Sequence, residues 1–323
     1  MTATATTGPS GLTHAFVLDG AGGGRALDWA GVDAWTPDDG VLWLNLDYSL
    51  SDGARWIATN LDDIARDALL DIDPRPRAFV RGDDLLMIVR GINLNVGAAP
   101  EDMISIRASI GPRRVVTLRH RTSTSIATIA SDLVRGVGPR DAAGFTSALI
   151  EHIVEHVVTR VDTIGDVVAS CEDQVLADAR GDVRARLADQ RRRAIALRRF
   201  LAPQRDALVK LAGVQLPWLA VDDHARYAES ADRLARTLEE LDAARDRAAV
   251  TQEELQSRIG EVTNQRLYLL SLITAVFLPL GFVCALLSVP LDHDEWPFWL
   301  LCGVCAIGAG TQIVAFKRRG WLG

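Results

Sequence analysis

The sequence lacks three features that define common classes of secreted and nucleic-acid-binding protein. Its first ten residues contain neither the basic residue nor the apolar run of a signal peptide, so we expect no cleaved export signal. Its four cysteines do not make a disulfide framework, because three of them lie in the apolar C-terminal segments, and a reducing compartment is expected. The net charge of −7 argues against a phosphate-binding surface, and no nucleic-acid partner is expected.

Long apolar runs are also absent from the first 267 residues, but two of them follow. Residues 268–290 and 298–316 contain no Lys, Arg, Asp or Glu. A helix of about 20 apolar residues crosses the hydrocarbon core of a bilayer, and each segment meets that length. The pattern predicts two membrane spans joined by a short acidic connector, with the lipid bilayer as a partner.

Charged residues around the two segments predict their orientation. Lys317, Arg318 and Arg319 follow the second segment, and Arg258 and Arg266 precede the first. The connector has acidic residues and no basic one. Because Lys and Arg near span ends stay on the cytoplasmic side, we expect a multi-pass protein of the inner (plasma) membrane with both termini cytoplasmic.

The residues before the hairpin show two styles of sequence. Residues 1–122 are predicted to form an α/β cytosolic domain, in which short β-branched and aromatic runs alternate with Gly, Pro and Asp. The predicted strands are residues 14–18, 41–46, 85–90, 103–107 and 115–118, with one helix at 54–70. Residues 123–267 are predicted to form a cytosolic helical domain, followed by the transmembrane hairpin and basic tail at 268–323.

Three long helices are expected in the helical domain. Two cover residues 141–179 and 182–213, and the third begins after Pro217 and has no proline before Pro279, so it extends for ~90 Å into the first span. Apolar residues repeat along it with spacings of three, four and seven: Leu234, Leu238, Leu241, Ala248, Leu255, Ile259 and Val262. This seam fits packing within the chain and equally a symmetric helix bundle.

One face of the third helix suggests an ion pathway. It consists of small, hydroxyl and apolar residues at helical spacing: Asn264, Leu267, Ser271, Thr274, Leu278, Gly281, Ala285 and Ser288. Two spans cannot enclose a pore, so several copies would have to place this face around an axis. The alternative is that small residues serve only close helix contact.

Several segments resemble a known family. Residues 90–95, 100–107, 192–205, 261–282 and 316–322 look like those of the CorA superfamily of divalent-cation transporters, most of all its zinc transporter ZntB branch. The resemblance implies a homopentamer with a funnel-shaped cytosolic part, a pore lined by the first span, and zinc uptake coupled to protons. It implies no resident cofactor, since Zn²⁺ would be cargo, with Mg²⁺, Co²⁺ and Ni²⁺ as competitors.

The chain departs from this family at the outer end of the first span. The family has a Gly-x-Asn signature there, whereas this chain has Ser288 and Pro290 at the corresponding positions. Proline has no side-chain donor or acceptor and no backbone N–H, so it cannot hold a hydrated cation as an amide can. The departure leaves open a magnesium or cobalt transporter of the CorA type, or a diverged paralogue with altered or lost conduction.

The acidic connector offers a substitute for the missing signature. Asp292, His293, Asp294 and Glu295 supply carboxylate oxygens and one imidazole, and repetition around an axis would concentrate them at the outer mouth. Imidazole favours zinc over magnesium. The alternative is that these residues only solvate the turn between two spans.

A second metal motif occurs within the helical domain. His152, Glu155 and His156 match the His-x-x-Glu-His pattern of inverted zinc proteases, with both imidazoles on one helix face. Such a site needs a third ligand and an open water position. We therefore expect surface or structural histidines, with an auxiliary metal site and a membrane-anchored metalloenzyme as competing interpretations. The expected protein is not an enzyme.

Overall fold

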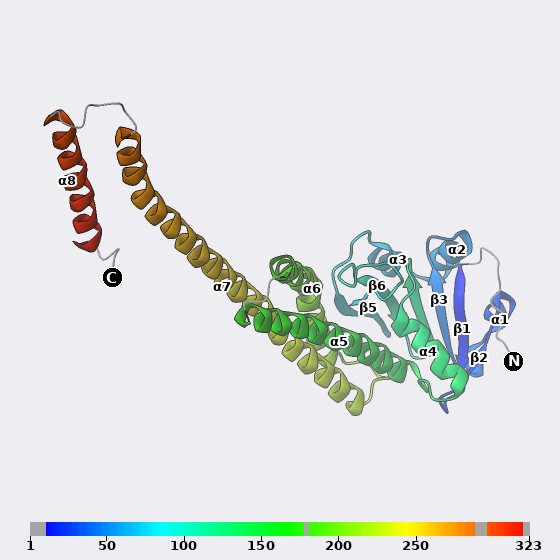
Figure 1. The fold of residues 1–323 in the computed structure, drawn as a ribbon. Coiled ribbons are helices and arrows are strands. Elements are labelled where there is room, and N and C mark those ends of the chain that lie inside the picture. Colours follow the sequence, from blue (N-terminus) through cyan, green and yellow to red (C-terminus); the bar gives the residue numbers. More distant parts are fainter. Residues whose placement is uncertain (1–10, 178–180, 288–295, 319–323) are drawn as a thin grey trace. The chain divides into compact units, whose positions relative to one another are not determined.

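The computed structural model describes residues 11–177, 181–287 and 296–318 (Figure 1). The strands are β1 (Leu12–Leu18), β2 (Gly24–Ala26), β3 (Val41–Asp47), β4 (Arg77–Arg81), β5 (Asp84–Gly91), β6 (Ile104–Ile110) and β7 (Arg114–Arg119). The helices are α1 (Trp29–Ala34), α2 (Ser51–Asn60), α3 (Asp63–Leu70), α4 (Thr124–Arg135), α5 (Ala142–Leu176), α6 (Val183–Ala212), α7 (Val221–Leu287) and α8 (Trp296–Arg318).

The strands form one mixed sheet with the order β2-β1-β3-β7-β6-β5-β4. Neighbouring strands are antiparallel except β3 and β7, which run parallel with Trp43 opposite Val115. Helices cover both faces, because successive side chains of a strand point to opposite faces and both sets are apolar here. This arrangement explains why the predicted strands read as nearly continuous apolar runs.

Two hydrophobic cores lie on the two faces of the sheet. Phe16, Trp43 and Met87 belong to the core that includes residues of α4, α5, α6 and the first part of α7. Val17, Leu44 and Leu86 belong to the other core, with residues of α2 and α3. Two successive residues of a strand thus lie in different cores. Burial of both faces fixes the register in which the strands pair.

The structure confirms each of the five predicted strands and adds two. The edge strands β2 and β4 were missed, because β2 has three residues and β4 begins and ends with exposed or half-buried arginines. The predicted single helix at 54–70 is wrong. It divides into α2 and α3 because the chain is extended at Leu61 and Asp62, where the Asp62 side chain accepts a hydrogen bond from the Ala65 amide and begins a new helix.

The long helices agree closely with the predicted ranges. The helices α5, α6 and α7 begin and end within a few residues of the expected limits, and residues 221–278 of the expected segment without proline lie inside α7. The start of the seam packs within the chain, since Leu234, Leu241 and Ala248 are buried, the first two in the core shared with α5 and α6. Further along, Ile259 and Val262 are exposed.

The chain forms two compact units, residues 1–252 and 253–323. The first unit contains the sheet, α1 to α6 and the beginning of α7. The second contains the rest of α7 and α8. The domain limits predicted after residues 122 and 267 divide the chain differently, and they stay predictions.

Candidate functional site

The predicted ion-pathway residues lie on one face of α7. Within the described part of the chain, Asn264, Leu267, Ser271, Thr274, Leu278, Gly281 and Ala285 follow one another at spacings of three and four. Such spacing places side chains on one face of a helix. All seven residues are exposed in the single chain, and Leu278 reaches 70% exposure. The face is uncharged and uncovered.

Hydrogen bonding within α7 defines what this face offers. The Thr274 hydroxyl donates to the carbonyl oxygen of Leu270 at 2.9 Å, so its oxygen lone pairs remain available to a ligand. Pro279 lies inside the helix and has no N–H for the carbonyl four residues earlier. A Cβ added at Gly281 would meet no atom of the described residues within 4 Å, so their contacts do not require glycine there.

The remaining predicted pore and mouth residues follow α7 in the sequence. Ser288, Asp292, His293, Asp294 and Glu295 lie outside the described residues. Among the residues that are described, no helix has a stretch both long and apolar enough to span a membrane.

The predicted metal pair on α5 faces α4. His152 Nε2 lies 3.8 Å from an oxygen of Asp132, and His156 Nδ1 lies 3.3 Å from the Ser125 hydroxyl. Burial lowers the pKa of His156, with a smaller opposing effect of Glu155. A neutral imidazole is the form that binds metal, but no group of three His, Cys, Asp or Glu side chains comes together in the described ranges.

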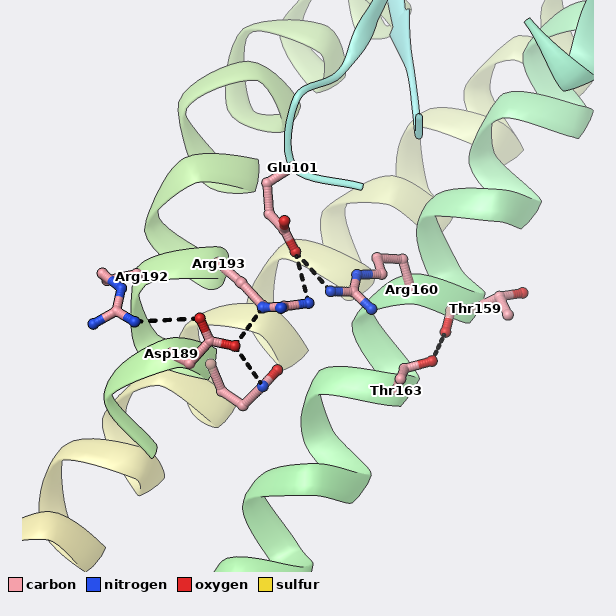
Figure 2. A network of polar contacts seen from close by, with 8 residues as sticks. Glu101, Thr159, Arg160, Thr163, Asp189, Arg192 and Arg193 are labelled. Atoms are coloured by element: carbon pink, nitrogen blue, oxygen red, sulfur yellow. Dashed lines mark hydrogen bonds and ion pairs between the residues drawn. The ribbon is translucent and has the colours of Figure 1, made fainter. Parts of the chain in front are cut away.

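A charged cluster that the sequence analysis did not predict joins the sheet to the long helices (Figure 2). Glu101, in the connection between β5 and β6, accepts a hydrogen bond from Arg160 of α5 at 2.6 Å and lies 3.4 Å from Arg193 of α6. Arg193 also donates to Asp189 at 2.6 Å, one turn earlier on α6. Glu101 and Arg160 are only 12% and 15% exposed as side chains, so their pairing satisfies two charges that are largely out of water.

Arg90 forms a second connection between the sheet and α6. Its guanidinium donates to Asp73 at 2.8 Å and lies 4.6 Å from the centre of the Phe200 ring, while its backbone amide donates to the Gln204 side chain at 2.6 Å. The three segments at 90–95, 100–107 and 192–205 therefore meet in space. The sequence signals for these contacts were Arg90 and Glu101, two charged residues beside apolar runs. Their partners are distant in the chain, so the sequence did not predict the contacts.

Comparison with known proteins identifies the same set of transporters from family, sequence and structure. The family model "CorA-like Mg2+ transporter protein" matches residues 38–318. The chain is 37% identical to the divalent cation transporter CmaX of Pseudomonas aeruginosa and 34% identical to the zinc transport protein ZntB of Pectobacterium carotovorum. In both cases the match covers 97% of each chain.

Solved structures extend this similarity to the fold. The full-length CmaX structure superposes with a TM-score of 0.88 at 36% identity, covering 97% of this chain and 99% of that chain. The CorA magnesium transporter of Methanocaldococcus jannaschii superposes with a TM-score of 0.74 at 16% identity, covering 95% and 98%. At that identity the second comparison shows a common fold only.

Proposed function

Because this chain belongs to the family of CorA-like Mg²⁺ transporters and is a divalent-cation transporter, we propose that it takes up zinc in preference to magnesium, driven by a proton gradient. We propose further that five subunits enclose the pathway and that the first transmembrane segment of each lines it. The protein lies in the inner membrane as a hairpin of residues 268–290 and 298–316, with both termini cytoplasmic.

The uncharged, exposed face of α7 is the observation on which this proposal rests. In one subunit, the seven described residues of this face, which begins at Asn264 and ends at Ala285, are exposed, and so are apolar residues on other faces of the same helix, such as Ile273 and Phe277. Neighbouring copies and lipid would cover both sets. Around an axis, Ser271 and Thr274 form hydroxyl rings and Leu278 an apolar constriction, while Asn264 marks the inner end and Gly281 a close approach.

The charge pattern supports the membrane hairpin. Basic residues lie at its two cytoplasmic ends, at Arg266 and Lys317, and neither apolar segment contains a charged residue. A charged side chain at the centre of a bilayer costs roughly 3 kcal/mol by insertion scales, so an uncharged run of this length favours insertion.

The preference for zinc rests on the connector and on the relatives named ZntB. The mouth lacks the amide ring of the family signature, since Ser288 and Pro290 occupy those positions. Asp292, His293, Asp294 and Glu295 replace it as the group that captures the incoming ion, and His293 supplies the nitrogen ligand that favours zinc.

Flux into proteoliposomes tests the proposal. We expect the purified full chain to transport Zn²⁺ faster than Mg²⁺ and to do so faster with an acidic exterior. Faster Mg²⁺ flux would instead support the alternative of a magnesium or cobalt transporter. Absence of flux for any divalent ion under any gradient would support the diverged paralogue and refute transport of metal.

A narrower experiment tests the mouth. Converting Asp292, Asp294 and Glu295 together to their amides removes three charges from each subunit while keeping side-chain size. We expect lower uptake at limiting zinc, unchanged uptake at saturating zinc and an unchanged oligomeric mass. Unchanged uptake at limiting zinc would remove these residues from the mechanism.

A further inference from the structure

An acidic stripe covers the exposed face of α5. Its members are five carboxylates repeated at intervals of four and seven residues: Glu151, Glu155, Asp162, Asp166 and Asp173. All five are exposed, and none forms an ion pair within the described part of the chain. Arg160, the one arginine of α5, is turned away into the pairing with Glu101. This face thus has no positive charge to balance it.

A basic stripe covers the exposed face of α6. Its members are Arg184, Arg191, Arg192, Arg198, Arg199 and Lys210, whereas Asp206 is the one exposed carboxylate of this helix. Arg192, Arg198 and Arg199 have partners, at 3.3 Å to Asp189, 2.8 Å to Asp242 and 3.9 Å to Asp73. Arg184, Arg191 and Lys210 form no ion pair with any residue that the structure describes.

The two stripes do not neutralise each other within one chain. The helices α5 and α6 share a core, but no ion pair between described residues joins the five carboxylates to the six basic residues. The positions repeat every 11 residues on α5, and the arginines of α6 repeat every seven. At 1.5 Å per residue these are rises of about 16 and 10 Å, so each stripe runs nearly straight along its helix for several turns.

We propose that the acidic stripe of one subunit docks on the basic stripe of the next in a head-to-tail contact between copies of this chain. The inference rests on the proposed function, since it assigns a contact surface to the proposed ring of subunits. Two different surfaces in contact make a heterologous interface, which closes into a ring when the rotation permits. Like charges would meet if two acidic or two basic stripes faced each other, so an isologous pairing is disfavoured.

A second copy of the chain is the partner that uses both surfaces. A polyanion would engage α6 alone, and a basic peptide would engage α5 alone. A neighbouring subunit supplies the opposite charge to each stripe at the same time. Because exposed ion pairs are individually weak and screened by salt, the contact orients the subunits and is weakened at high ionic strength.

Zero-length crosslinking tests the contact. Lys210 and Lys317 are the only lysines of the sequence, so Arg191→Lys places one new amine in the middle of the basic stripe and preserves its charge. A carbodiimide joins an amine to a touching carboxylate as an amide, with loss of water. The full chain is expressed with ¹⁴N and ¹⁵N labels, the two preparations are mixed during assembly in lipid nanodiscs, and crosslinked peptides are identified by mass spectrometry.

We expect the amine introduced by Arg191→Lys to be joined to Glu155, Asp162 or Asp166 in pairs of mixed isotope. The control Arg113→Lys, which places an exposed amine beside the sheet, should give at least tenfold less crosslinking to these carboxylates. Light scattering is measured on these nanodiscs, and zinc flux on proteoliposomes reconstituted from the same mixed preparation. An oligomer that transports zinc but gives no mixed-isotope crosslink overturns this contact alone. A chain that is monomeric and inactive overturns the proposed function and the contact together.

A charge exchange gives an independent test. We expect Glu155→Lys, Asp162→Lys and Asp166→Lys together to weaken subunit association at low salt by at least tenfold, and Arg184→Glu, Arg191→Glu and Arg192→Glu to do the same. Combining both sets restores opposite charges across the interface and restores association. Association that is insensitive to all three variants would show that the stripes are solvated faces only.

Discussion

Adjacent acidic residues in this molecule have very different roles. Glu101 is 12% exposed and lies between Arg160 and Arg193, whereas Asp102 is 60% exposed and pairs with Arg121 at the surface. Removing a partner from a largely buried ion pair leaves an uncompensated charge, but removing a surface partner costs little. Burial therefore decides which of two neighbouring carboxylates stabilises the fold.

We expect Glu101→Ala to lower the free energy of unfolding by about 3 kcal/mol, because two guanidinium groups lose their shared acceptor. Asp102→Ala is the matched control, with an expected loss below about 1 kcal/mol. Denaturant unfolding of the detergent-solubilised chain measures both. Equal losses would show that the cluster of Figure 2 does not stabilise the contact between the sheet and the helices.

His14 gives the sheet a dependence on pH. Its ring lies 5.9 Å from the Trp43 ring, and burial, aided by Arg119, lowers its pKa. The folded state therefore prefers the neutral imidazole. The unfolded chain takes up a proton near its ordinary pKa of about 6.5, so this contribution to stability is present above that pH and is lost as the pH falls through it.

We compare the free energy of unfolding at pH 7.5 and at pH 5.5. It should fall less between these values in His14→Gln than in the unchanged chain, by a difference of less than about 1 kcal/mol. The His120→Gln variant, which removes an exposed imidazole, serves as the control. Unfolding curves at the two pH values measure the difference. A pH dependence that survives unchanged in His14→Gln would assign it to other groups.

At the scale of an element, α7 changes its surroundings along its length. Leu241 is fully buried against α5 and α6, whereas Ile259 is 55% exposed in the single chain. Of the two alternatives for the seam of apolar residues, packing within the chain therefore holds for its first part. Its second part is available for other copies, as the proposed ring requires.

This difference predicts separate effects of two truncations in one helix. Leu241→Ala should lower the free energy of unfolding by roughly 2–5 kcal/mol, since it removes buried methyl groups and leaves a cavity. Ile259→Ala should lower it by less than about 1 kcal/mol and instead weaken subunit association. Unfolding and light scattering separate the two; a large folding defect from Ile259→Ala would argue against its exposure.

A hydroxyl on the pathway face allows a matched comparison between the two C-terminal helices. Thr274→Val keeps the side-chain shape and removes the lone pairs that we assign to a hydroxyl ring, so we expect zinc uptake to fall on the order of tenfold. Thr311→Val in α8 removes a hydroxyl that likewise donates within its own helix, at 2.8 Å to the Ile307 carbonyl. Similar uptake in both variants would remove Thr274 from the pathway.

For the whole molecule, the sequence predicted regular elements better than the contacts between them. Periodicity is local, so the limits of α5, α6 and α7 could be read from apolar spacing. The partners of Arg90 and Glu101 could not, because Gln204 and Arg160 lie 114 and 59 residues away. The short edge strands β2 and β4 were missed for lack of a sufficient pattern, and the site residues from Ser288 to Glu295 stay predictions.

Transport of charge by the whole assembly should respond to voltage as well as to pH. If two positive charges enter per zinc ion, an inside-negative potential of ~100 mV favours accumulation by about 4.6 kcal/mol. We expect a potassium diffusion potential to raise initial zinc uptake and an acidic exterior to raise it further. Uptake that responds to voltage but not to pH would support a channel without proton coupling.

The parallel pairing of β3 with β7 also bears on how the chain folds. Asn45 and Thr117 are opposite each other in this pair although 72 residues separate them. The antiparallel strands β5, β6 and β7 have nearer partners and smaller loops to close, so we expect them to associate first. During synthesis β3 would then wait, unpaired on the β7 side, until β7 has left the ribosome. The slow step in forming this sheet should therefore be the closure of that 72-residue interval, which makes the early chain the part most in need of protection from aggregation.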